Sequence, residues 1–368
     1  MTVQDVQHIL ELWAPREIAW ERDNVGLQVG NSQQLVNRIL VALDATEDIV
    51  EEARRKKVEL IITHHPLLFR SPKSITPGDR VGAVTIGLIR NKISLYATHT
   101  NLDFAKEGVS HALAERLSLH EIRVLEGSRD FFSKITVFVP TEYVGQVTEA
   151  MAEAGAGEIG KYDRCSFTVE GTGAFRARDG AKPFVGSIGK VETVGESRVE
   201  MIVPRWKVSS TIRAMREAHP YEEIAFDIYP LENESTEYGA GALGKLKQQM
   251  TLQSLLKVVK KALKIPALKF TGELKRKIET VAVCGGSGSD YITAAIRKGA
   301  DAFITADLKY HDFETARGRI ALIDAGHFET ERWSLERIIH YLTTRPVFRK
   351  ENIRVTMAST ITNPVHYF

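Results

Sequence analysis

Short, continuous hydrophobic runs alternate with helical patterns in the first third of the chain. The runs cover residues 38–44, 59–63 and 93–98. Such runs are typical of strands that are buried on both faces of a parallel sheet. Residues 47–57 and 80–91 lie between the runs and are predicted to be helices, and Thr46 with Asp48 can cap the first of them. The order strand, helix, strand predicts parallel strands joined by helical crossovers.

The same pattern returns in the last third of the chain. Strands are predicted at residues 281–284, 302–305 and 320–324, with a helix at residues 289–298. Residues 41–43 match residues 281–283, and residues 60–63 match residues 302–305, which indicates an internal repeat. We therefore predict an α/β fold with two pseudo-equivalent lobes.

The middle of the chain has a different order of elements. Strands are predicted at residues 134–139, 164–170, 199–203 and 224–229, and helices at residues 142–154 and 206–218. Strand, helix, two strands, helix and strand is the order of a ferredoxin-like α+β domain. The predicted domains are residues 1–130 for the first α/β lobe, residues 131–235 for the inserted domain and residues 236–368 for the second α/β lobe.

The composition narrows the range of partners and locations. The 368 residues are 43% hydrophobic and 26% charged, with a formal net charge of +2. No basic run is long enough to favour nucleic acid as a partner, and no segment approaches the roughly 20 apolar residues of a membrane span. The first 12 residues lack the apolar core of a signal peptide. Cys165 and Cys284 lie far apart, which predicts two free thiols in a reducing cytoplasm.

Candidate chemistry begins where the hydrophobic run at residues 59–63 stops. His64 and His65 follow it directly, and Pro66 ends the strand. Neighbouring residues of an extended backbone point to opposite sides, so these two imidazoles address two ions more easily than they chelate one. This favours a dinuclear metal site, whereas a pair of surface histidines at the end of a strand is the alternative.

The repeat strengthens the metal interpretation. His99 and Asp103 follow the third strand of the first lobe, and His327 and Glu331 follow the third strand of the second lobe. Residues four apart lie on one face of a first helical turn and can reach a shared ion. A mixed nitrogen and oxygen set suits zinc, iron, manganese or cobalt, and it argues against calcium or a thiolate copper site. Asp44 ends a strand at the same edge and is a candidate for orienting a ligand histidine.

These motifs resemble those of the GTP cyclohydrolase 1 type 2 homologue family, also called the Nif-three-like proteins. The resemblance rests on residues 62–66, 99–103 and 326–331 and covers the whole chain. It implies a dinuclear centre between two similar α/β lobes and a homohexamer. The metal ligands that it implies are His64, His65, Asp103, His327 and Glu331, with Glu331 as the bridge. His99 would lie beside them, and the insert, with residues 219–222, resembles PII-like or CutA-like domains.

Three other features have competing interpretations. Residues 239–244 match a dinucleotide-binding fingerprint but follow a polar hinge, so we interpret them as re-entry into the main sheet. Residues 285–288 are predicted to form a turn, and their amides either hold a phosphate or serve a tight turn. Cys284 is interpreted as a buried apolar residue, and His219 before Pro220 as a helix terminator or, alternatively, a regulatory ligand.

The leading hypothesis for function is a metal-dependent hydrolase. Two divalent cations, with zinc favoured over iron and manganese, would activate water for opening a purine ring or cleaving a phosphoester of a small-molecule substrate. His99 and Glu329 are the candidates for moving the proton. The alternative is a non-catalytic regulatory or metal-trafficking module in which a PII-like insert senses a ligand.

Overall fold

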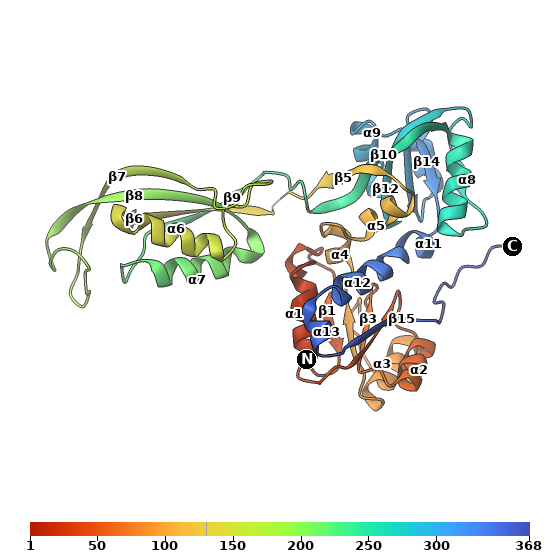
Figure 1. The fold of residues 1–368 in the computed structure, drawn as a ribbon, viewed down its shortest axis with the longest axis horizontal. Coiled ribbons are helices and arrows are strands. Elements are labelled where there is room, and N and C mark those ends of the chain that lie inside the picture. The colour runs from red at the N-terminus through yellow and green to blue at the C-terminus, as the bar shows by residue number, and fades with distance from the viewer. Residues whose placement is uncertain (130) are drawn as a thin grey trace. The chain divides into compact units, whose positions relative to one another are not determined.

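The protein divides into two compact units. The structure is a computed structural model that describes residues 1–129 and 131–368. The first unit consists of Met1–Gly127 and Glu237–Phe368, and the second consists of Ser128–Thr236 (Figure 1). Within the described ranges, no helix is long and apolar enough to cross a membrane.

The first lobe of the first unit is built on a five-stranded sheet. Its strand order is β1-β4-β3-β2-β15, with β1 antiparallel to β4 and the other strands parallel. The strands are β1 (Gly26–Val29), β2 (Arg38–Ala42), β3 (Leu60–Thr63), β4 (Ser94–Ala97) and β15 (Arg354–Met357). The predicted strands at residues 38–44, 59–63 and 93–98 are therefore confirmed as β2, β3 and β4.

Helices cover both faces of this sheet. On one face, α2 (Glu47–Lys56) and α3 (Arg80–Arg90) pack against alternate strand residues such as Leu40, Ile61 and Leu95 (Figure 1). On the other face lies α1 (Val3–Glu11), whose Glu11 accepts a hydrogen bond from the Tyr96 hydroxyl at 3.3 Å. Burial on both faces is the reason for the continuous apolar runs. Thr46 caps α2 as predicted, and its hydroxyl accepts a hydrogen bond from the Ile49 amide.

The second lobe contains a six-stranded sheet of order β11-β14-β13-β12-β10-β5. Strands β12, β13 and β14 are parallel, and the outer strands are antiparallel to their neighbours. The strands are β5 (His120–Gly127), β10 (Gly239–Thr251), β11 (Lys269–Thr271), β12 (Lys277–Ser287), β13 (Ala302–Ala306) and β14 (Ala321–Asp324). Helices α5 (Val109–Arg116) and α8 (Leu252–Leu263) share one core cluster with this sheet, and α9 (Ile292–Arg297) and α10 (Tyr310–Ala316) pack in another.

The internal repeat is confirmed by the topology of the two sheets. Strands β2, β3 and β4 occur in the same order and direction as β12, β13 and β14. Each third strand leads into a short helix, α4 (Thr100–Phe104) or α11 (His327–Glu331). After α11, helices α12 (Trp333–Thr343) and α13 (Pro346–Lys350) return the chain to the first sheet, where β15 pairs with β2.

Two glycine-rich stretches are parts of strands in the second lobe. Residues 239–244 open β10, which pairs with both β5 and β12, so re-entry into the sheet is confirmed. The turn predicted at residues 285–288 is wrong, because β12 continues to Ser287. The turn to the next helix begins one residue later, at Gly288.

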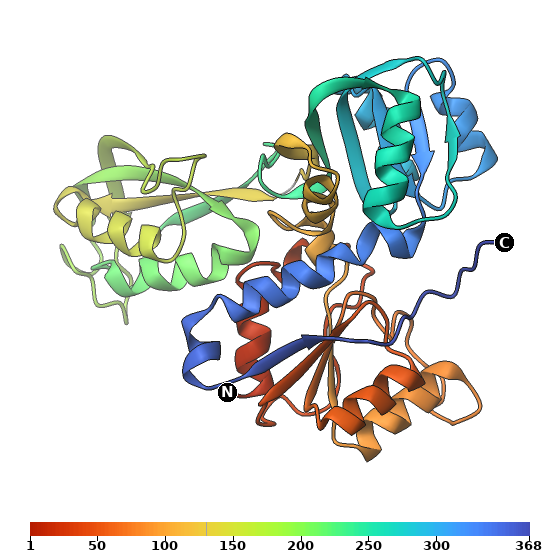
Figure 2. The same ribbon diagram turned by 45° about the vertical axis from the view of Figure 1, so that its right-hand side comes forward.

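The second unit is a four-stranded antiparallel sheet with two helices on one face (Figure 2). Its strands are β6 (Phe132–Pro140), β7 (Phe167–Arg176), β8 (Val191–Pro204) and β9 (Phe226–Leu231), and its helices are α6 (Val144–Glu153) and α7 (Val208–Ala218). The strand order β7-β8-β6-β9 is ferredoxin-like, as predicted. Strands β7 and β8 reach much further into the glycine-rich stretch than the predicted strands, forming a long hairpin. His219 ends α7, as predicted for a terminator.

The chain enters and leaves the second unit at adjacent points of the first. Gly127 at the end of β5 is paired with Gly239 at the start of β10. Inside the second unit, Phe132 of β6 is paired with Leu231 of β9. The second unit is thus inserted between two neighbouring antiparallel strands.

Candidate metal centre

Strands β3 and β4 of the first sheet and β14 of the second deliver histidines to the same region of the first unit. His64 and His65 follow β3, and their amides donate to the carbonyls of Ala42 and Leu43 at 3.3 and 2.9 Å, which continues the strand pairing. His99 lies between β4 and α4, directly before the first residue of the helix. His327 follows β14 and is the first residue of α11. Carboxyl ends of parallel strands meet at one edge of each sheet, which explains why the repeat places these residues together.

The five predicted ligands form one cluster around Glu331. Its Oε2 lies 2.9 Å from His65 Nε2 and 3.0 Å from His327 Nε2, and these two nitrogens are 3.2 Å apart. Its Oε1 lies 3.7 Å from His64 Nε2, which in turn is 3.6 Å from Asp103 Oδ1. One carboxylate therefore lies between a histidine pair and a histidine–aspartate pair. Donor atoms of His64, His65 and Glu331 all lie within 4.8 Å of one another.

Among the described residues, several buried atoms of this cluster make ion-pair contacts at most and no hydrogen bond of regular geometry. They are His64 Nδ1, His64 Nε2, Asp103 Oδ1 and Glu331 Oε2. Buried polar atoms are almost always hydrogen-bonded, so His64 Nε2, close to the carboxylates of Asp103 and Glu331 without such a bond, indicates a missing partner. Nitrogen and carboxylate donors in this arrangement fit divalent cations such as zinc, iron or manganese.

Each of the other three histidines makes a hydrogen bond with an aspartate. The Nδ1 atoms of His65, His99 and His327 pair with carboxylates of Asp44 at 2.8 Å, Asp23 at 2.8 Å and Asp307 at 2.6 Å, respectively. Such a bond fixes the ring and leaves Nε2 available as a ligand or proton carrier. The predicted contact of Asp44 is confirmed, whereas the sequence analysis did not find Asp23 and Asp307.

The signal for Asp307 was present in the repeat. Residues 60–63 match residues 302–305, so His65 and Asp307 occupy equivalent positions two residues further on. His65 supplies a ring nitrogen to the cluster, and Asp307 makes a hydrogen bond with His327 Nδ1. Asp23 lies in a loop without a counterpart in the second lobe, and no pattern marks it.

Burial and neighbouring charges together set the pKa values of the side chains in the cluster. Burial lowers the pKa of His64, which keeps its imidazole neutral, as a metal ligand must be. Burial and the charge of Glu331 raise the pKa of Asp103 to about 7. Burial would raise the pKa of Glu331 as well, but His64, His327 and His65 hold it well below its ordinary value. Burial likewise acts to lower the pKa of His65, but Asp44 and Glu331 raise it to about 9.

The two predicted proton carriers lie at the edge of the cluster. The ring centre of His99 is 5.5 Å from that of His64 and 5.8 Å from that of His65. Glu329 is buried, and its Oε1 accepts a hydrogen bond from Asn363 Nδ2 at 3.0 Å. Neither His99 nor Glu329 is among the side chains that directly contact Glu331. This position suits residues that would act on a bound molecule.

A cavity of about 390 Å³ opens beside His65 and His327. Glu329 and Lys269 line it, and residues 363–365 and 367 of the C-terminal segment form part of its wall. Thr362 donates a hydrogen bond to Asp44 at 2.8 Å, so this segment also contacts the support of His65. The sequence analysis missed this contribution of the C-terminal segment.

The three glycines among residues 285–288 are closely packed, and Gly286 leaves room for the side chain of Glu331. Gly286 has φ +64°, and a Cβ there would lie 2.0 Å from Glu331 Oε1. The amides of Gly285 and Gly286 already donate to Ser110 and Thr330 hydroxyls. Occupied amides beside a buried carboxylate do not favour a phosphate, so close packing explains these glycines.

Cys284 behaves as a buried apolar residue, as predicted. It is 7% exposed and packs with Phe303 and Leu322. Burial raises the pKa of its thiol to about 12, so it is not a thiolate nucleophile near neutral pH.

The fold and cluster define an α/β protein with a candidate metal site at the carboxyl ends of parallel strands in two repeated lobes. The chain matches the Duf34/NIF3 (NGG1p interacting factor 3) family over residues 1–364, and it belongs to this family. The resemblance noted in the sequence is thereby confirmed.

Relatives and solved structures agree with this assignment. The "GTP cyclohydrolase 1 type 2 homolog" of Bacillus subtilis is 40% identical over 363 residues, covering 98% of this chain and 97% of the relative. The crystal structure of a Bacillus cereus protein related to NIF3 has a TM-score of 0.85 at 35% identity, covering 100% of this chain and 99% of that one. A Staphylococcus aureus structure, protein SA1388, has a TM-score of 0.81 at 31% identity, with the same coverage.

Proposed function

We propose that this protein is a hydrolase that uses two divalent cations to act on a nucleotide or another phosphoester-type small molecule. The observation that supports the proposal is the group of buried, unpaired donor atoms around Glu331. His65, His327 and Glu331 Oε2 would hold one cation, and His64, Asp103 and Glu331 Oε1 would hold the other. Zinc is the favoured metal for this mixed donor set.

When bound, the cations would supply positive charge that polarises the bond to be cleaved and makes a nearby water molecule more acidic. The remaining tasks belong to side chains. The cavity of about 390 Å³ beside His65 is large enough for a small substrate. The names of the relatives make GTP the first substrate to test.

His99 is the favoured proton carrier. Burial would raise the pKa of Asp23, but its bonds with His99 and Thr100 lower it to about 2, so Asp23 stays ionised. An ionised Asp23 at His99 Nδ1 fixes the direction of the ring and leaves Nε2 to give or take a proton. Glu329, fixed by Asn363 in the cavity wall, is the second candidate.

The proposal is tested by metal content and turnover together. His64→Ala and Glu331→Gln should lower the metal measured by elemental analysis and abolish hydrolysis of GTP or model phosphoesters. His311→Ala, at an 85% exposed side chain, serves as the control and should change neither. Full metal content in both variants, or equal turnover by metal-free protein, would show the proposal to be wrong.

A non-catalytic regulatory module is the second candidate. It is favoured by the ferredoxin-like second unit, which contains a cavity of its own. In this case the unit would be a PII-like or CutA-like ligand sensor, and metal-loaded protein would show no turnover above the metal-free control. Assembly as a homohexamer stays a prediction, which light scattering after size exclusion would check.

A further inference from the structure

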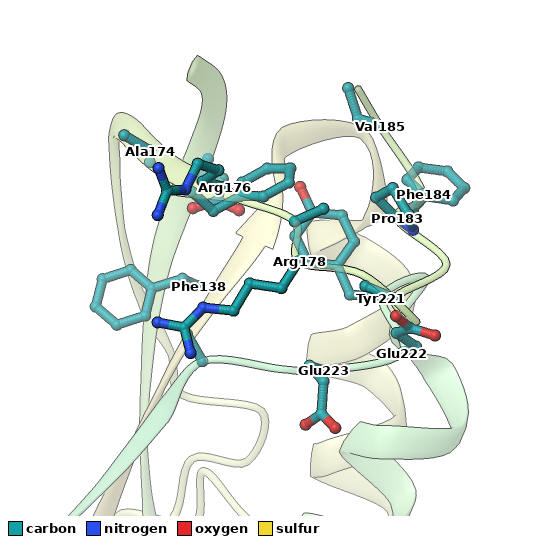
Figure 3. Close-up of a pocket in the computed structure, with 16 residues that line it drawn as sticks. Phe138, Ala174, Arg176, Arg178, Pro183, Phe184, Val185, Tyr221, Glu222 and Glu223 are labelled. Carbon is teal, nitrogen blue, oxygen red and sulfur yellow. The ribbon is translucent and has the colours of Figure 1, made fainter. Parts of the chain in front are cut away.

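The second unit contains a cavity of about 370 Å³, separate from the candidate metal cluster. It is lined by the end of β7, the loop after β7 and the residues that follow α7 (Figure 3). A cavity of this size falls in the range of small-molecule sites. Its lining combines aromatic rings, the guanidinium groups of Arg176 and Arg178, and the carboxylates of Glu196, Glu222 and Glu223.

Aromatic rings form one part of the lining. The ring centres of Phe184 and Tyr221 are 5.9 Å apart, and those of Phe175 and Tyr221 are 6.5 Å apart. Phe184 is 50% exposed although it is apolar, and the Lys182 amide holds its loop by donating to Glu222 at 2.7 Å. Flat, partly exposed rings on a fixed loop provide a surface on which a planar ligand can stack.

Two arginines supply positive charge to the same cavity. Neither Arg176 nor Arg178 has an ion pair with another described residue, whereas Arg164 and Arg198 of this unit pair with carboxylates at 2.7 and 2.8 Å. In Figure 3, both guanidinium groups lie on the side of the cavity opposite Pro183 and Phe184. Guanidinium groups left without a carboxylate suit a phosphate or carboxylate ligand, which they bind in a bidentate manner.

Acceptor and donor groups lie next to the rings. Glu196 lines the cavity and packs so closely on β7 that a Cβ at Gly173 would lie 2.0 Å from its Oε2. Burial and the neighbouring Glu196 carboxylate raise the pKa of Tyr221 to about 12, so its hydroxyl stays protonated next to Glu196. The carboxylate can accept from ring N–H or amino groups, and the hydroxyl can donate to a ring nitrogen.

We propose that this cavity binds a small anion that carries a planar nitrogen heterocycle, the chemical class to which nucleotides belong. The ring would stack on Phe184 and Tyr221 with its N–H groups toward Glu196, and the anionic group would lie on Arg176 and Arg178. The inference stands apart from the proposed hydrolase, because no residue of the metal cluster takes part.

Calorimetric titration of the full-length protein tests the proposal. Guanosine 5′-monophosphate and adenosine 5′-monophosphate are the probes, and guanosine and inorganic phosphate report on the ring and the anion alone. We expect a nucleotide to bind at least about tenfold more tightly than either fragment, since stacking and bidentate arginine contacts both contribute. Phosphate that binds as tightly as both nucleotides would overturn the proposal.

Paired variants place the binding site. The double change Arg176→Ala with Arg178→Ala should weaken nucleotide binding by about tenfold or more, and Phe184→Ala should weaken it by several-fold. Arg213→Ala and Phe167→Ala replace exposed residues of the same unit outside the cavity and should leave binding unchanged. Circular dichroism melts show whether each variant is folded. Equal binding by the folded arginine variant would overturn the proposal.

A metal-cluster variant separates this proposal from the hydrolase. His65→Ala should lose metal but retain nucleotide binding in the second unit. If His65→Ala abolishes binding while the arginine variant retains it, the nucleotide binds at the metal cluster. That result would overturn the present proposal and leave the hydrolase proposal standing.

Discussion

Three histidines near Glu331 each lie against an aspartate through Nδ1. This arrangement fixes the direction of each ring before any ligand arrives, because the hydrogen bond at one nitrogen determines where the other points. His64 is the exception, since it is fully buried and its Nδ1 has no hydrogen-bond partner among the described residues. Packing and the contacts of Nε2 with Asp103 and Glu331 must therefore hold its ring.

Asp307→Asn tests the supporting role of an aspartate without removing a ligand. Loss of the carboxylate makes His327 a weaker base, so metal affinity should fall by about 10- to 100-fold. Competition with a chromophoric chelator measures this change. Asp48→Asn, at an exposed position of α2, is the control, and equal affinities of the two variants would contradict the expected role of Asp307.

Gly286→Ala tests the close approach of Glu331. The new methyl group would meet Glu331 Oε1, so we expect lower metal content as well as lower stability. Gly299 also has positive φ, +76°, but a methyl group added there would have no other atom within 4 Å. Gly299→Ala therefore isolates the backbone strain of about 1–2 kcal/mol. Metal content that is equal in the two variants would contradict this account of Gly286.

At the scale of elements, α2 anchors the segment that follows β15. Glu52 of α2 is 1% exposed and accepts hydrogen bonds from the amides and hydroxyls of Ser359 and Thr360 at 2.6–2.9 Å. Burial would raise the pKa of Glu52, but the Lys56 ammonium and these four bonds hold it well below its ordinary value of 4.5. This anchor lies just before the residues that line the cavity beside the metal cluster.

Glu52→Gln should destabilise the protein near neutral pH by about 1–3 kcal/mol, the usual effect of weakening a buried, charged hydrogen-bond network. Because the folded pKa is depressed, the stability from ionisation is present above about pH 4.5 and is lost as the pH falls below it. Urea unfolding at pH 7 and pH 4 should thus show a smaller difference from the unsubstituted protein at the lower pH. Exposed Glu273→Gln is the control, and a difference that grows on acidification would contradict this reasoning.

The central strands and crossover helices could be predicted because burial on both faces leaves continuous apolar runs. Outer strands lack that signal, as β5 and β11 show with side chains that are mostly exposed or half-buried. Helix α8 could have been predicted, since Leu252, Leu255, Leu256, Val259 and Leu263 have the spacing of an amphipathic helix. The place of Asn363 and Tyr367 in the cavity wall could not be predicted, because only the folded chain brings them there.

At the scale of the whole molecule, the candidate metal cluster draws on both lobes of the first unit. His64, His65 and Asp103 come from the first lobe, and His327 and Glu331 come from the second. The repeat predicted this convergence, since equivalent strands end in equivalent chemistry. The second unit contributes none of these five donors.

Because Gly127 is paired with Gly239, β5 and β10 would form an ordinary β-hairpin if the second unit were absent. Excision of residues 128–236 and closure with a loop of about four residues should leave a folded protein with its full metal content. Elemental analysis and a thermal melt would check this, and an insoluble or metal-free product would contradict it. A single in-frame exchange of gene segments would then suffice to give such a protein the second unit or to take it away.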